Sequence, residues 1–348
     1  MIVSDRTGIV GVPVAGPGPW PLAAEVPRFR AGVHQPGGPV TVAGAALDGD
    51  VDTALARCVA EGVERYAAMV PRPDAWLAAV DGTPVARNAV LGHLSPLAAP
   101  PEDGYYPQGS TGLAAGPTLA AATESAAAEV VERDTLARAW RAGTPMPRTA
   151  LPAALAELAL AEELSVSAHL LPVRATVARV AVVALRHGGR RLIGVGSAYR
   201  PEPVDGLAKA FTEAVVSLAQ QAELADPVTG PGLAAGAGLD PWRADRRYAA
   251  GGWAHVADIA QHAQLLLDPE LQEAVWERFV GLGFETVAAQ PPQPAASVAA
   301  MELLDDAVLV ELSTPDCAPY VVVRVLAAGA EVVRPAGDRP EELPCPLV

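Results

Sequence analysis

The chain has 348 residues and a mass of 35.7 kDa; 51% of its residues are hydrophobic and 19% are charged. This composition can fill a sizeable core and excludes an intrinsically disordered chain. The formal net charge of −15 argues against a nucleic-acid backbone as partner, because phosphate contacts need clustered basic residues. Lys209 is the only lysine, so a P-loop, whose lysine reaches the phosphates, is excluded.

The three cysteines, Cys58, Cys317 and Cys345, are odd in number and have no CxxC-type spacing. They indicate a reduced, intracellular protein and not a disulfide-stabilised one. The first residues contain no basic segment followed by an apolar run, and the longest uncharged stretch, 104–123, is interrupted by Pro and Gly. We therefore expect neither a secretory signal nor a membrane-spanning helix, and we expect a cytoplasmic protein.

Taken in chain order, the sequence alternates short β-type runs, the first at 9–14, with longer Ala- and Val-rich segments. Capping residues and proline stops predict helices over 51–70, 119–141, 152–164, 204–224, 255–267 and 269–279. Asp48 or Asp50 would cap the first of these helices and Thr118 the second. Strands are predicted over 76–90, over 173–185 and 192–196 as a hairpin, and over 307–312 and 320–326. Loops are predicted over 94–109, 110–117 and 226–238.

Two of these predicted helices carry nearly the same motif, since residues 60–65 and 128–133 both read Ala-Glu-x-Val-Glu-Arg. On a helix the two glutamates and the arginine of each motif project from one face. A single copy is typical of a solvated face with ion pairs worth a few tenths of a kcal/mol. Two copies among Ala and Val instead indicate a buried acidic centre.

If the two faces meet, four carboxylates converge. Like charges about 4 Å apart repel by roughly 4 kcal/mol at a surface-like effective dielectric, so the cluster needs a compensating cation. Oxygen-rich acidic sites bind Mg²⁺, often with substrate phosphates completing the shell. The predicted metal ligands are Glu61, Glu64, Glu129 and Glu132.

The segment 110–119, Ser-Thr-Gly-Leu-Ala-Ala-Gly-Pro-Thr-Leu, precedes the second acidic helix, where backbone amides can bind phosphate. Together with Glu-Val-Val-Glu-Arg-Asp at 129–134, it resembles the signature of YcaO-domain proteins. In that family a Ser-Asn-Gly-x-Ala-x-Gly-Asn segment leads into a helix that ends in Glu-x-x-Glu-Arg. The segments 60–66, 207–214 and 322–326 are similar to the family's first acidic helix, its later Ala-rich helix and its late Val-x-Arg-Val strand.

This resemblance implies one α/β domain over 1–348, a mixed sheet-and-helix YcaO-like fold with an internal pseudo-repeat and a Pro-rich C-terminal tail at 343–348. It implies ATP and Mg²⁺ as cofactors, and phosphate transfer to the oxygen of a peptide-backbone amide. The cofactor-binding residues that it implies, besides the four glutamates, are Arg65, Arg133, Glu213 and Arg324.

The tail, Leu-Pro-Cys-Pro-Leu-Val, resembles the Pro-x-Pro-x-Pro end of azoline-forming members, whose chain end assists proton transfer. This resemblance implies a catalytic role for the C-terminal carboxylate of Val348. The alternative is a disordered tail, which is common for Pro-rich termini.

The reaction implied by the resemblance is cyclodehydration of Cys, Ser or Thr to thiazoline or oxazoline in a ribosomally made precursor peptide. The implied partners are this peptide, an E1-like (ThiF-like) or leader-binding protein, and a second copy of the chain in a homodimer. Thioamide or amidine formation, and an amide-forming ATPase acting on small molecules, remain alternatives.

The chain also departs from the family pattern. Segment 43–47 lacks the family's lysine, and Arg57 stands where the family commonly has Ser. Further departures, where relatives often have Ser, Asn, Glu and Gln, are Ala114, Pro117, Ala121 and Ser125. These departures favour a further alternative, a catalytically impaired subunit that serves as a scaffold in a peptide-modifying complex.

Overall fold

The structure, a computed structural model, describes most of the chain. The described residues are 2–5, 8–16, 22, 25–34, 40–69, 76–79, 81–82, 84–86, 110–174, 176–189, 191–236, 242–243, 264–284, 298–327, 329–331 and 342–346. Within these ranges, no helix combines the length and the apolar character that crossing a bilayer requires.

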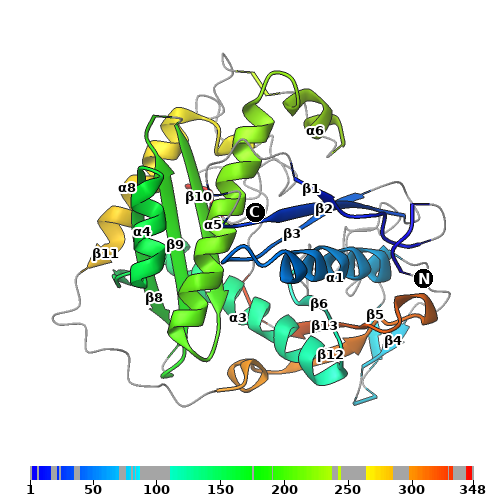
Figure 1. Cartoon of the computed structure of the whole chain (residues 1–348). Coiled ribbons are helices and arrows are strands. Elements are labelled where there is room, and N and C mark those ends of the chain that lie inside the picture. Colours follow the sequence, from blue (N-terminus) through cyan, green and yellow to red (C-terminus); the bar gives the residue numbers. More distant parts are fainter. Residues whose placement is uncertain are drawn as a thin grey trace. The chain divides into compact units, whose positions relative to one another are not determined.

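The chain divides into two compact units. Unit 1 comprises Met1–Pro19, Ala23–Asp134 and Val298–Val332, and unit 2 comprises Trp20–Leu22, Thr135–Ser297 and Val333–Val348. Helix α3 (Leu119–Ala142) begins in unit 1 and ends in unit 2 (Figure 1). The interpretation of residues 1–348 as a single domain stays a prediction.

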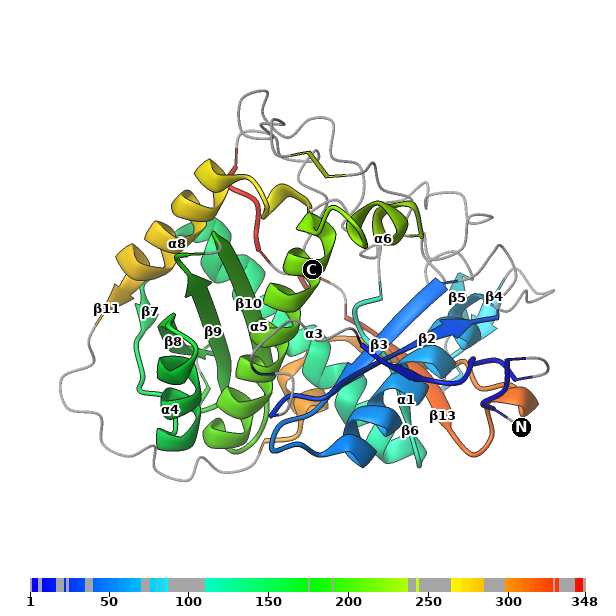
Figure 2. The same ribbon diagram turned by 45° about the horizontal axis from the view of Figure 1, so that its top comes forward.

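The N-terminal part of unit 1 is a three-stranded antiparallel sheet with a helix packed against it (Figure 2). Its strands, in spatial order, are β1 (Val14–Ala15), β2 (Arg28–Val33) and β3 (Val40–Ala45). Helix α1 (Val51–Met69) lies against β2 and β3. Gly44 permits this close approach, because a Cβ at this position would lie 2.2 Å from the backbone nitrogen of Cys58.

Both acidic helices begin where the sequence predicts. Asp50, and not Asp48, caps α1, since its Oδ1 accepts a hydrogen bond from the Thr53 amide at 2.9 Å. In α3 the Thr118 hydroxyl oxygen accepts a hydrogen bond from the Ala121 amide at 3.2 Å. The caps fix where each helix starts, and therefore which residues face its neighbours.

A second antiparallel sheet completes the core of unit 1. Its strands, in spatial order, are β12 (Ala307–Glu311), β13 (Val321–Ala327) and β6 (Leu113–Gly116). Smaller elements of this unit are β4 (Trp76–Ala78), β5 (Pro84–Ala86), η4 (Ala300–Leu303) and η5 (Pro315–Cys317). The buried cluster joins Val63 of α1 to Val322 of β13, so α1 and this sheet share one core.

Unit 2 is built on a third antiparallel sheet. Its strands, in spatial order, are β10 (Leu192–Tyr199), β9 (Arg179–His187) and β8 (Leu164–Pro172). The other elements are β7 (Met146–Pro147), α4 (Ala153–Ala161), α5 (Pro203–Ala225), α6 (Gly230–Gly236), α8 (Pro269–Leu282) and β11 (Gly283–Phe284). Helix α5 packs against β9 and β10 through Gly194 and Gly196, where a Cβ would lie 2.1 Å from a carbonyl oxygen of α5.

The structure confirms most of the predicted helices, including α1, α3, α5 and α8, and both late strands. The predicted helix over 152–164 ends early at Ala161, because Glu163 has a φ of 55° that a helix cannot contain. Residues 164–172 then form a strand, β8, that the sequence analysis missed.

Two predicted loops were wrong in part, since 110–117 contains β6 and 226–238 contains α6. The predicted hairpin begins later than expected, at Arg179. Most of the predicted helix over 255–267 lies outside the described residues. The internal pseudo-repeat is not confirmed.

Candidate functional site

The acidic face of α1 lies beside strand β6. Glu61 forms an ion pair with Arg65, one turn further along the helix. Glu64 points to the strand, where its Oε1 accepts a hydrogen bond from the Ala115 amide at 2.8 Å. The second glutamate of this motif is therefore tied to the sheet, and the first is tied to the arginine.

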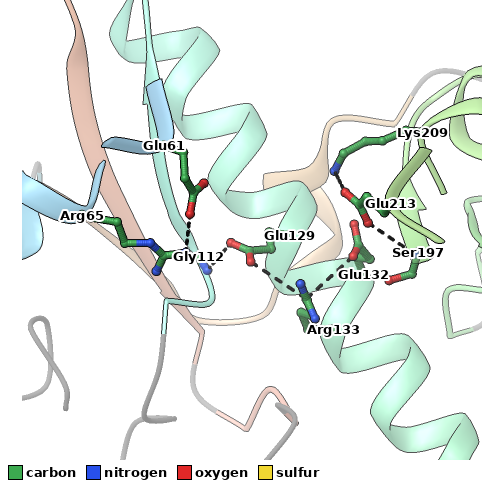
Figure 3. A network of polar contacts seen from close by, with 9 residues as sticks. All are labelled: Glu61, Arg65, Gly112, Glu129, Glu132, Arg133, Ser197, Lys209 and Glu213. Carbon is green, nitrogen blue, oxygen red and sulfur yellow. Dashed lines mark hydrogen bonds and ion pairs between the residues drawn. The ribbon is translucent and has the colours of Figure 1, made fainter. Parts of the chain in front are cut away.

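The acidic face of α3 contacts the chain just before β6 through Glu129, the first glutamate of its motif. Glu129 Oε2 accepts a hydrogen bond from the Gly112 amide at 3.0 Å (Figure 3). Arg133 Nε lies 3.9 Å from Glu129 Oε1 and 3.7 Å from Glu132 Oε1, so this guanidinium serves both glutamates. Glu132 is 2% exposed. The two motifs therefore contact segment 110–116 through different glutamates, the second of the motif in α1 and the first in α3.

Segment 110–116 is what brings the two motifs together. Its amides at 112 and 115 donate to Glu129 and Glu64, which lie on different helices. Gly112 has a φ of +80°, and a Cβ there would lie 2.2 Å from the carbonyl oxygen of Val325. Only glycine fits this turn. These two amides, which the sequence analysis considered as phosphate donors, instead position carboxylates.

The carboxylates are close enough to change one another's ionisation. Burial, and next the charge of Glu61, hold the pKa of Glu64 well above its usual range. Burial also raises the pKa of Glu129, although Arg133 and the Gly112 N–H oppose this shift. Glu61 acts on both groups, so these three glutamates form one electrostatic cluster.

Arginines partly balance this negative charge. Burial alone would lower the pKa of Arg65, but attraction to Glu61 and Glu64 raises it. Arg324 of β13 is fully buried, and burial lowers its pKa to about 10 even though Glu129 favours its charged form. Among the described residues, Glu61, Glu64 and Glu129 therefore share one electrostatic cluster with Arg65 and Arg324, and Arg133 links Glu129 to Glu132.

The donor set fits a magnesium ion whose remaining ligands come from a phosphate and water. Among the described residues, no group of three His, Cys, Asp or Glu side chains is arranged to hold a metal ion by itself. Mg²⁺ does not need such a group, because it commonly takes one or two protein carboxylates and keeps several waters. The raised pKa values of Glu64 and Glu129 are the expected signature of buried carboxylates that a cation would stabilise.

The remaining predicted site residues belong to unit 2 or are not described. Glu213 belongs to unit 2, where it forms an ion pair with Lys209, with 3.1 Å between Nζ and Oε1. Its Oε2 also accepts a hydrogen bond from the Ser197 amide at 3.4 Å (Figure 3). Val348 lies outside the described residues.

Sequence reasoning missed the contacts that position α3 itself. Both carboxylate oxygens of Glu124 accept hydrogen bonds from the Ala300 amide, at 3.0 and 3.1 Å. Asp134 Oδ1 accepts another from the Glu331 amide at 2.6 Å. The partners are 176 and 197 residues away in the sequence, so no local pattern could have indicated them.

A family model described as "YcaO cyclodehydratase, ATP- and Mg²⁺-binding" matches residues 80–331. This description names the two cofactors that the sequence analysis predicted, which confirms them at the level of the family. A comparison with curated protein sequences found no match.

Solved structures share the fold at low sequence identity. The YcaO protein of Methanopyrus kandleri, solved bound with AMPPCP and Mg²⁺, is 19% identical, with a TM-score of 0.64; the match covers 97% of this chain and 91% of that one. A heterocyclase in complex with substrate and cofactor is 15% identical, with a TM-score of 0.62; the match covers 95% of this chain and 51% of that one.

A chain of the E. coli microcin synthetase McbBCD complex, solved with pro-MccB17 bound, is 11% identical, with a TM-score of 0.57. That match covers 90% of this chain and 86% of the other. Together, these likenesses confirm the predicted α/β fold of mixed sheets and helices.

Proposed function

Because the chain belongs to the YcaO family, we propose that it is an ATP- and Mg²⁺-dependent enzyme that activates a backbone amide of a ribosomally made precursor peptide. The proposed reaction is cyclodehydration of Cys, Ser or Thr to thiazoline or oxazoline. The observation that carries this proposal is the meeting of Glu64 and Glu129, from two separate helices, at the amides of segment 110–116.

In the proposed site the glutamates hold the metal. Glu61, Glu64, Glu129 and Glu132 are the proposed source of carboxylate oxygens, the ligands that Mg²⁺ prefers. One or two of them would bind a given ion, with phosphate and water as its other ligands. When bound, the ion would neutralise the charge of a transferring phosphoryl group. The hydrogen bonds from Gly112 and Ala115 keep Glu129 and Glu64 in place before any ligand arrives, which lowers the cost of assembling the site.

The arginines have a different role in this proposal. Guanidinium groups bind phosphate oxygens with two parallel hydrogen bonds. Arg65 and Arg133 each lie within an ion pair of the acidic cluster, so a bound phosphate would share them with the glutamates. Arg324 is fully buried and contributes a fixed positive charge near Glu129.

A catalytically impaired scaffold subunit is the second candidate, and specific residues favour it. Arg57 stands at the position of the family's serine, and its Nη1 donates to the Ala45 carbonyl oxygen at 2.8 Å. Ala114 is buried in β6 and has no polar side-chain group to offer a nucleotide. Thioamide or amidine formation remains a further alternative for the active enzyme.

Nucleotide binding separates the two candidates. We expect saturable binding of ATP in isothermal titration calorimetry that requires Mg²⁺, and we expect Glu129→Ala to weaken it at least tenfold. Glu273→Ala is the matched control, since Glu273 is an exposed glutamate that pairs with Arg186 on unit 2. No binding in the presence of Mg²⁺, precursor peptide and leader-binding partner would favour the scaffold.

Several parts of this proposal extend beyond the acidic site. Glu213 is proposed as a further cofactor-binding residue and Val348 as a source of a catalytic carboxylate. The proposed partners are the precursor peptide, an E1-like or leader-binding protein and a second copy of the chain, and the proposed location is the cytoplasm. Light scattering of the purified protein, alone and with the candidate partner, tests the assembly.

A further inference from the structure

The Pro-rich segment 342–346 is docked on unit 2. Trp140, near the end of α3, donates a hydrogen bond from Nε1 to the carbonyl oxygen of Leu343 at 2.9 Å. Pro344 and Pro346 are buried, whereas Cys345 between them is partly exposed. The segment therefore lies against the protein surface, with one partly exposed cysteine between two buried prolines.

Trp140 is itself held rigidly. The residue is 3% exposed, and the centroid of its ring lies 5.0 Å from the centroid of the Phe279 ring. The guanidinium carbon of Arg278 lies 4.9 Å from the Trp140 ring, and the same arginine donates to the Trp140 carbonyl oxygen. A donor fixed in this way selects one position for the carbonyl that it contacts.

The sequence of the segment explains why it needs such a donor. Pro344 and Pro346 have no backbone N–H, so the segment cannot form a regular ladder or helix of its own. The residue before a proline is restricted to extended conformations, which holds Leu343 in an open strand-like geometry. An indole N–H, which can only donate, is a suitable partner for the Leu343 carbonyl oxygen.

Helix α3 adds a second observation. Trp140 follows Glu129 by eleven residues, which is about three turns of an α-helix, so both residues lie on one face of α3. The helix that carries two of the proposed metal ligands therefore also carries the contact that orients segment 342–346.

We propose that Trp140 is a positioning residue: its indole N–H orients segment 342–346 along α3, and loss of this N–H releases the segment. The effect on catalysis rests on the proposed function, because it assumes that the residues after Leu343 contribute to the reaction. The effect on the segment itself does not, so the two can be tested separately.

The thiol of Cys345 reports on the docking. Cys58 and Cys317 are fully buried, so in the folded protein we expect DTNB to react with Cys345, and Cys345→Ser to abolish this reaction. Trp140→Phe keeps an aromatic ring but removes the N–H together with the second ring of the indole, and the Trp276→Phe control below makes the same change of size. One lost hydrogen bond is worth about 1 kcal/mol, so we expect the Cys345 reaction to be about fivefold faster or more.

Trp276→Phe is the matched control. Trp276 lies in α8, where its ring centroid is 5.9 Å from the guanidinium carbon of Arg186, and Trp276→Phe is the same type of substitution at a different position. We expect the Cys345 rate in this variant to stay within twofold of the wild type. Pro344→Ser, which removes a buried ring from the segment and leaves the core intact, should accelerate the reaction as Trp140→Phe does.

An unchanged Cys345 rate in folded Trp140→Phe, or equal acceleration by Trp276→Phe, would overturn the proposal. The catalytic consequence has its own measurement: kcat for the precursor peptide should fall while the KM for ATP stays constant. If the thiol rate rises but no variant, nor the wild type, turns over peptide, the positioning role stands and the proposed function fails.

Discussion

The two units differ in how well the protein itself satisfies their buried polar groups. In unit 2, His169 is fully buried but completely satisfied: Nδ1 lies 3.3 Å from the Met146 carbonyl oxygen and Nε2 lies 2.8 Å from the Ser167 hydroxyl. Since a carbonyl only accepts, Nδ1 carries the proton and Nε2 accepts from the serine. In unit 1, by contrast, burial, and to a lesser extent the charge of Glu61, raise the pKa values of Glu64 and Glu129.

This difference distinguishes a structural polar cluster from a candidate binding site. The hydrogen bonds of His169 join β8 to Met146 of β7 and to Ser167 within β8 itself, so the cluster stabilises the fold without any ligand. The acidic site contains carboxylates whose pKa values burial raises, and a bound cation would stabilise their charged form. The contrast predicts that charging the buried group of unit 2 lowers the free energy of unfolding, whereas removing a buried charge from unit 1 raises it.

The largest expected effect concerns His169. Burial lowers its pKa from 6.5 to about 4, so the folded protein binds fewer protons than the unfolded chain between these values. The free energy of unfolding should therefore fall as pH decreases from 6.5 toward 4, by about 3 kcal/mol from this group at most. NMR titration of the histidine ring measures this pKa directly, and His169→Phe identifies the resonance.

A His169 resonance that titrates near pH 6.5 would remove the contrast, because the imidazole would then be solvated. In urea unfolding, the wild type should lose more stability than His169→Phe over the same pH interval.

A smaller effect of the opposite sign is expected in unit 1. Glu64→Gln retains an oxygen that can accept from the Ala115 amide and removes a charge that burial and Glu61 disfavour. We expect the ligand-free variant to gain about 1 kcal/mol in the free energy of unfolding at pH 7, while Mg²⁺-dependent ATP binding is lost. Urea unfolding and calorimetry measure the two quantities on the same sample.

A loss of stability in Glu64→Gln would mean that the cluster is already balanced by its arginines. Glu61→Gln is the useful companion, because it removes the partner of Arg65 and should not give the same gain.

The smallest effect is expected for the surface pair of α5. The side chains of Lys209 and Glu213 are 30% and 38% exposed, and pairs of this kind contribute a few tenths of a kcal/mol. Glu213→Gln should change the free energy of unfolding by less than about 0.5 kcal/mol. A larger loss would show that Glu213 belongs with the buried polar groups of unit 2.

Local sequence patterns predicted the helices well and the strands less well. The starts of helices α1 and α3 were predictable because a capping residue, Asp50 or Thr118, directly precedes each of them. Strand β8 was missed because the sequence analysis predicted no element over 165–172; the positive φ of Glu163 separates the preceding helix from this strand. Strand β6 was missed because its four small residues become a strand only by pairing with β13, about 200 residues later.

In the candidate site, too, local sequence determined some features and tertiary structure determined others. The spacing Glu-x-x-Glu-Arg by itself determined that two glutamates and an arginine of each helix share a face, because helical periodicity is a local property. Tertiary structure alone decided that Glu64 meets Ala115, Glu129 meets Gly112 and Trp140 meets Leu343. These contacts join residues 51, 17 and 203 positions apart, and chain folding, not helix geometry, selects which amide or carbonyl each side chain meets.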